Sequence, residues 1–132
     1  GESTQVIVEN GGDCWLHLAD DLTVGLVAGD SPFSGRIGLK ITATQTPGAL
    51  CTSSGTVGHS YSEGRADAVT VYARDAALAD AAATAVANRV RSAADVDAAL
   101  AFAQTIAGVA GVCIVIHDKL GIWGDLSLVK LP

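Results

Sequence analysis

The chain has 132 residues, of which 49% are hydrophobic and 17% charged, and its formal net charge is -6. This composition argues against disorder and predicts one domain, residues 1–132, with a core of its own. The negative charge disfavours nucleic acid, because phosphate binding needs clustered Lys and Arg, and no apolar run approaches the roughly 20 residues of a membrane span.

Strands dominate the predicted first half. β-Branched and apolar residues predict four strands, at residues 4–9, 14–18, 23–28 and 37–44. The segment Asn10-Gly11-Gly12-Asp13 is a strong tight-turn signal between the first two strands. The order of these segments predicts an antiparallel meander. Residues 45–64 are rich in Thr, Ser and Gly and predict a long loop, and loops of this length are usually functional or mobile.

The second half predicts two helices between strands. Asp75 is a good N-cap for an alanine-rich helix over residues 76–91, and Ser92 for a second helix over residues 93–106. The remaining predictions are a strand at 68–73, a buried strand at 109–117, a turn at 118–121, and one or two strands within 122–131. The whole pattern predicts an α+β layered sandwich, in which two helices pack on a mostly antiparallel sheet.

Three cysteines, Cys14, Cys51 and Cys113, are widely spaced and form no C-x-x-C pair. An odd number without such a pair fits neither a disulfide framework nor a zinc knuckle. We therefore expect reduced, mostly buried thiols in a cytoplasmic protein.

The alanine-rich helix carries polar residues at a four-residue spacing. Asp80, Thr84 and Asn88 therefore lie on one helix face, one turn apart. A carboxylate and a hydroxyl in this arrangement can offer two oxygens to Mg²⁺ or Ca²⁺, although a hard cation takes about six. The alternative is a solvated face whose threonine bonds back to its own helix. The spacing alone favours the solvated face.

Two other segments have a structural and a functional interpretation. The glycines of Asn10-Gly11-Gly12-Asp13 either shape a hairpin turn or let backbone amides approach a ligand phosphate. The run from Cys51 to Ser60 combines small residues, hydroxyls and His59, which suits an anion or nucleotide cradle. A serine nucleophile with His59 as its base is a minor alternative, since the G-x-S-x-G elbow is absent. We expect His17 and His117 to be structural residues within strands.

These motifs, in this order, resemble the C-terminal half of the ApbE superfamily, flavin transferases that attach FMN from FAD to a protein threonine. Asn10-Gly11-Gly12-Asp13 looks like the N-x-G-G-D turn of that family, and Thr52-Ser53-Ser54-Gly55 like its T-S-G loop. Val69-Thr70-Val71 and the later run from Ala79 to Ala85 are similar to its V-T-V and A-D-A-L-A-T-A signatures. A branch called uncharacterised protein family 0280 is more similar still, over residues 51–60, 66–69 and 118–124.

The resemblance implies a T-fold-related sandwich and a specific set of site residues. In the transferases, the residues that match Asp80 and Thr84 bind Mg²⁺, which makes a metal site the favoured interpretation of this pair. His59 becomes the candidate catalytic proton carrier. The residues expected to bind FAD or FMN are Asn10, Gly11, Gly12, Asp13, Thr52, Ser53, Ser54 and Gly55. The sequence departs from the family after its T-S-G loop, because Gly58-His59-Ser60-Tyr61-Ser62-Glu63-Gly64 stands where the transferases carry H-i-x-D-P-x-T-G.

The expected function is therefore flavin or nucleotide binding, with Mg²⁺-dependent FMN transfer from FAD as the activity that the resemblance implies. A non-catalytic binding or assembly module on the same scaffold is the alternative. The resemblance also implies that an N-terminal half of such proteins is missing here. The expected partners are therefore that missing half or a partner chain that carries it, and a homo-oligomer is a separate expectation.

Overall fold

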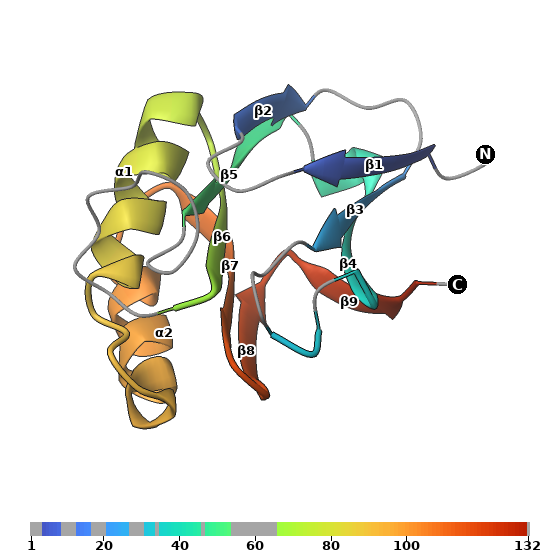
Figure 1. Cartoon of the computed structure of the whole chain (residues 1–132). Helices are drawn as coiled ribbons and strands as arrows, with labels where there is room; N and C mark the ends of the chain where they lie inside the picture. The colour runs from blue at the N-terminus through green and yellow to red at the C-terminus, as the bar shows by residue number, and fades with distance from the viewer. Residues whose placement is uncertain are drawn as a thin grey trace.

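The computed structural model describes residues 4–8, 13–16, 21–26, 31–33, 35–45, 47–53 and 66–131. These residues form three layers: two helices, a five-stranded sheet and a four-stranded sheet (Figure 1). The α+β class and the mostly antiparallel pairing predicted from the sequence are confirmed. No helix in the described part of the chain has the length and hydropathy needed to cross a membrane.

The five-stranded sheet is antiparallel throughout. In spatial order its strands are β2 (Asp13–Leu16), β5 (Gly48–Ser53), β6 (Ala68–Ala73), β7 (Val109–Ile116) and β8 (Lys119–Gly124). Every residue of β5 and β6 is buried. This sheet is therefore the middle layer of the molecule, covered on both faces.

The four-stranded sheet contains one parallel pair. In spatial order its strands are β1 (Thr4–Val8), β3 (Leu22–Leu26), β4 (Ile37–Ile41) and β9 (Ser127–Lys130). The strands β1 and β3 run parallel, whereas β3–β4 and β4–β9 are antiparallel. The predicted meander is wrong, since β1 and β2 belong to different sheets. Residues 10–12 of the tight-turn signal lie outside the described residues, and long-range pairing of β2 with β5 determines which sheet that strand joins.

Both helices cover the same face of the five-stranded sheet (Figure 1). Helix α1 (Ala76–Ala87) begins at its predicted cap, where the Asp75 carboxylate accepts a hydrogen bond from the Leu78 amide at 2.7 Å. It ends before residue 91, because the amides of Arg89 and Val90 bond three residues back instead of four, and the Arg91 amide donates to the Asp95 carboxylate. The expected second helix is a 3₁₀ turn (Ala93–Asp95) followed by α2 (Val96–Gln104). As predicted, Ser92 is its N-cap, in a capping box with Asp95.

Two hydrophobic clusters separate the layers. The first, between the helices and the five-stranded sheet, contains the buried alanines of α1 together with Val69, Val71 and Ile114. The second, between the two sheets, contains Leu39, Ile41 and Tyr72. Both clusters use aliphatic side chains almost exclusively, as the low aromatic content requires.

The prediction of a loop over residues 45–64 is wrong for its first part, because Gly48–Ser53 form strand β5. Gly48 obscured this strand in the sequence, since glycine weakens a strand signal. In the structure a side chain at Gly48 would collide with the Tyr72 ring, so glycine is required there. The Tyr72 hydroxyl donates to the Gln45 carbonyl at 2.9 Å.

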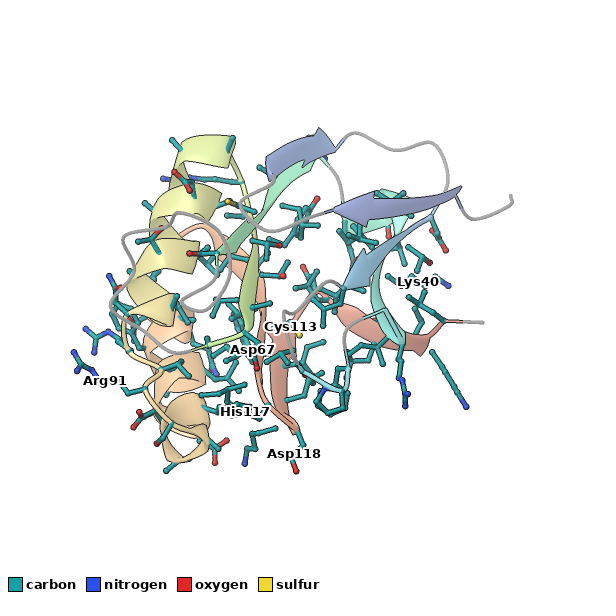
Figure 2. The ribbon with its side chains drawn as sticks, viewed as in Figure 1. Lys40, Asp67, Arg91, Cys113, His117 and Asp118 are labelled. Atoms are coloured by element: carbon teal, nitrogen blue, oxygen red, sulfur yellow. The ribbon has the colours of Figure 1, made fainter. Side chains whose placement is uncertain are left out.

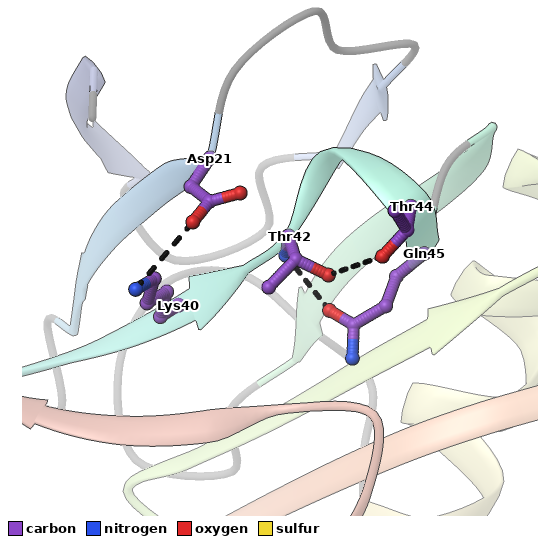
Figure 3. Close-up of polar contacts among 5 residues, drawn as sticks. All are labelled: Asp21, Lys40, Thr42, Thr44 and Gln45. Carbon is purple, nitrogen blue, oxygen red and sulfur yellow. Dashed lines mark hydrogen bonds and ion pairs between the residues drawn. The ribbon is translucent and has the colours of Figure 1, made fainter. Parts of the chain in front are cut away.

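Strand β4 ends at Ile41, earlier than the predicted residue 44, because side chains cap the backbone there (Figure 3). The Thr42 amide donates to Gln45 Oε1 at 2.8 Å, and the Thr42 and Thr44 hydroxyls lie 3.1 Å apart. These contacts enclose a short 3₁₀ turn (Ala43–Gln45). On the preceding strand, Lys40 pairs with Asp21 at 3.5 Å in a half-exposed ion pair.

The turn between β7 and β8 lies at residues 117–118, so the predicted turn at 118–121 is misplaced and β8 begins at Lys119. His117 is in this turn, exposed and with a positive φ of 50°. Buried Asp67 lies beside it and accepts a hydrogen bond from the His117 amide at 2.6 Å (Figure 2). This bond stabilises a left-handed conformation that the sequence pattern does not reveal.

Candidate functional site

The predicted metal ligands Asp80 and Thr84 lie on the exposed face of α1. The Thr84 hydroxyl donates to the Asp80 backbone carbonyl at 3.1 Å. This is the back-bonded threonine of the solvated-face interpretation. The bond uses only the hydroxyl proton, so the oxygen keeps its lone pairs for a cation. Both interpretations of the pair agree with this geometry, and the metal site stays a prediction.

Cys51 connects this helix face to the five-stranded sheet. It lies in β5 with 3% of its surface exposed, and its thiol donates to Asp80 Oδ1 at 3.6 Å. Cys51 directly precedes Thr52 and Ser53, the first residues of the T-S-G-like segment. The helix motif and the loop motif therefore meet at one side-chain contact.

The glycine-rich segment reaches the same place through backbone pairing. Its last residue, Asp13, is the first residue of β2 and pairs with Cys51 in the β2–β5 ladder. Helix α1 packs against β5 and also contacts β2. Three motifs that are far apart in the sequence thus converge around Cys51.

The two hydroxyl residues of β5 lie on opposite faces of the sheet, since successive side chains of a strand alternate. The Thr52 hydroxyl lies 3.0 Å from that of Thr70, buried on the face toward the four-stranded sheet. Ser53 follows on the helix-facing side, together with Cys51. Of this pair, Ser53 alone shares the face on which Asp80 lies.

Several predicted site residues lie outside the part of the chain that the structure describes. They are Asn10, Gly11, Gly12, Ser54, Gly55 and His59. Their expected roles in ligand binding, and that of His59 in proton transfer, stay predictions.

The donor set of α1 fits one class of cation. Within the described ranges no three His, Cys, Asp or Glu residues group as metal ligands. This differs from a structural zinc site, which uses four nitrogen or sulfur ligands. Mg²⁺ is commonly held by one or two carboxylates together with substrate phosphates and water. The Asp80 carboxylate and Thr84 hydroxyl are hard oxygen donors of that kind, so they fit a cation that binds with a phosphate-bearing ligand.

A serine, a histidine and an aspartate also meet in the structure, away from α1. The Ser31 hydroxyl donates to the His117 backbone carbonyl, and the Asp67 carboxylate accepts from the His117 amide. A hydrolytic triad needs these contacts to be made by the imidazole ring. Both hydrogen bonds are made by the His117 main chain instead, so this cluster stabilises the β7–β8 turn.

Sequence reasoning missed the contact between Cys51 and Asp80. The only available signal was the position of Cys51 immediately before the Thr-Ser pair. The contact depends on how closely α1 approaches β5, which the pattern of either segment does not specify.

Comparisons with known proteins place the chain among relatives over most of its length. The UPF0280 protein of Methanocaldococcus jannaschii is 44% identical over 131 residues, covering 95% of this chain and 54% of the relative. The UPF0280 protein of Methanopyrus kandleri is 46% identical over 125 residues, covering 90% of this chain and 51% of the relative. The chain thus spans about half the length of the curated relatives it matches. The family model described as AbpE bacteria matches residues 1–122, and the chain belongs to this family.

Proposed function

We propose that this chain binds a flavin nucleotide together with a divalent cation, and that Asp80 and Thr84 hold the cation. FMN transfer from FAD is the activity that this arrangement would serve. The proposal is supported by the resemblance of these motifs to those of the flavin transferases and by where the described residues of the motifs lie.

One observation carries the proposal: the three motifs of the site meet at Cys51. Its thiol bonds to Asp80, and its backbone pairs with Asp13, the end of the glycine-rich segment. The T-S-G-like segment begins at the next residue. A ligand bound beside Cys51 would lie near Asp80 on the helix and near the start of the T-S-G-like segment.

The chemistry follows from the donor types. Mg²⁺, when bound, would neutralise charge on the FAD pyrophosphate and on the departing AMP. Asp80 supplies the negative charge that attracts the cation, and Thr84 supplies a neutral oxygen one turn away. His59 is the candidate proton carrier for the accepting hydroxyl.

Binding experiments with two matched aspartate variants test the proposal. FAD and FMN are titrated into the chain with and without Mg²⁺, for the parent protein, Asp80→Ala and Asp97→Ala. Asp97 is the control because it is also an exposed helix aspartate, in α2. We expect Mg²⁺ to strengthen FAD binding in the parent and in Asp97→Ala, and to have no effect in Asp80→Ala. Absence of FAD binding, or binding that is unchanged by Asp80→Ala, would contradict the proposal.

An assembly module remains a second candidate because of strand β9. In the described part of the sheet β9 is an edge strand, paired with β4, and its Leu128 is 41% exposed. An exposed edge with a large apolar side chain favours association with another chain. The titrations separate the two candidates, since a purely assembling protein leaves FAD unbound.

A further inference from the structure

We infer that Cys51 is a positioning residue, whose thiol orients the Asp80 carboxylate for the cation. The inference rests on the proposed function, because it assigns a role within the same cation site. Cys51 itself is not placed among the ligands.

The two partners differ in how firmly the fold holds them. Cys51 is buried in β5, between neighbouring strands and beneath α1. Asp80 is exposed on the helix surface, where a carboxylate can adopt several rotamers. A hydrogen bond from the Cys51 thiol to Oδ1 therefore restricts the rotamers of the Asp80 side chain.

The bond leaves the carboxylate able to bind a cation. A carboxylate offers about four lone-pair sites on its two oxygens, and the thiol occupies one of them. A thiol is also a weak hydrogen-bond donor, so it withdraws little charge from the carboxylate. Orientation is gained with only a small loss of the charge that attracts the metal.

The small residues of α1 allow this contact. Ala79 and Ala83 are fully buried and belong to the same core cluster as Cys51. Methyl side chains at these positions let the helix lie close enough for a short cysteine side chain to reach Asp80. The alanine-rich composition of the helix thus serves the site as well as the core.

The test measures Mn²⁺ binding, in place of Mg²⁺, by electron paramagnetic resonance, with FAD held at constant concentration and an FAD-only blank subtracted. The variants are Cys51→Ala, Cys51→Ser, Cys113→Ala and Asp80→Ala. Cys113 is the matched control because it is equally buried in the same sheet but faces the other cluster. Thermal unfolding followed by circular dichroism confirms that each variant is folded.

Loss of the donor in Cys51→Ala should weaken Mn²⁺ binding about two- to threefold, the lower end of the equilibrium effect of one hydrogen bond, because a thiol is a weak donor. Cys51→Ser restores a donor and should bind Mn²⁺ as tightly as the parent does. Cys113→Ala should bind as the parent does. This pattern separates hydrogen bonding from loss of packing.

Two results would overturn the inference while leaving the proposed function intact. One is unchanged Mn²⁺ binding in Cys51→Ala, with binding still lost in Asp80→Ala. The other is equal weakening in Cys51→Ala and Cys51→Ser, which assigns Cys51 a packing role only. If the parent protein binds no Mn²⁺, or Asp80→Ala binds it normally, the proposed function fails and this inference fails with it.

Discussion

Burial changes the acid–base behaviour of two side chains between the sheets. Desolvation raises the pKa of Cys113 from 9.0 to about 12. The pKa of Tyr72 is raised as well, first by burial and then by the negative charge of Asp125. Both groups are neutral when protonated, so the fold favours their protonated forms.

The sign of these shifts predicts sensitivity to alkali. A group with a higher pKa in the folded state contributes its full stability below its unfolded pKa and loses it as pH rises toward the folded value. For Cys113 this interval runs from pH 9.0 to about 12. We expect the free energy of unfolding to fall across it, by at most about 1.4 kcal/mol per pH unit for this one group.

Urea unfolding at several pH values between about 8 and 11 measures the effect. Cys113→Ala should show a shallower decline than the parent, whatever its stability at neutral pH. Tyr72→Phe should remove the separate contribution of the phenol to the decline of the unfolding free energy with pH. Parallel pH profiles for all three proteins would show that neither group is responsible.

At the scale of elements, α1 depends on the cap at its first turn. Asp75 accepts the Leu78 amide, and replacing such a cap by Ala costs about 1 kcal/mol. We expect Asp75→Ala to lower the free energy of unfolding by that amount in urea denaturation. Asp75→Asn should retain most of it, because asparagine caps helices about as well.

Arg74→Ala is the control for the cap variant. Arg74 pairs with Asp75 at 3.6 Å, but both side chains are more than half exposed, so the pair contributes little. Its removal should leave the unfolding free energy nearly unchanged. A loss in Arg74→Ala as large as that in Asp75→Ala would assign the effect to the ion pair.

Local signals in the sequence predicted those elements that local interactions determine. The cap at Asp75 and the strand Ala68–Ala73 agree with their predictions to the residue. Strand β5 was missed because Gly48, which Tyr72 requires, conceals it. The pairing of β1 and β2 was wrong because no residue of a tight turn specifies which distant strand is the partner.

The same distinction holds for the site. Spacing within one helix was enough to place Asp80 and Thr84 on a common face. The thiol of Cys51 could not be assigned to Asp80, since their contact joins a strand and a helix. The placement of Thr52 and Ser53 on opposite faces of the sheet likewise depends on both residues belonging to a strand, which the sequence did not indicate.

At the scale of the whole molecule, the three layers predict a gradient of stability. Strand β6 is buried along its length, flanked by β5 and β7, and covered on both faces. Strand β9 is an edge in the described sheet, with three of its four residues exposed. Protection from exchange follows burial and pairing. We expect β6 amides to exchange with deuterium slowest and β9 amides much faster.

Hydrogen exchange followed by NMR or mass spectrometry measures this gradient. The amides of β3 provide a comparison, since that strand is flanked on both sides but belongs to the outer sheet. The exchange rates of the β3 amides should lie between those of β6 and those of β9. Equal protection of β9 and β6 would mean that the layers open as one cooperative unit.

The pairing of β4 with β9 also has a consequence for synthesis of the chain. Leu39 pairs with Leu128, so the partner of β4 leaves the ribosome only after both helices and the whole five-stranded sheet. Until then β4 presents an unpaired edge on a nascent chain, and such edges recruit other strands. Translation speed and chaperone access during this interval should therefore affect the yield of soluble protein.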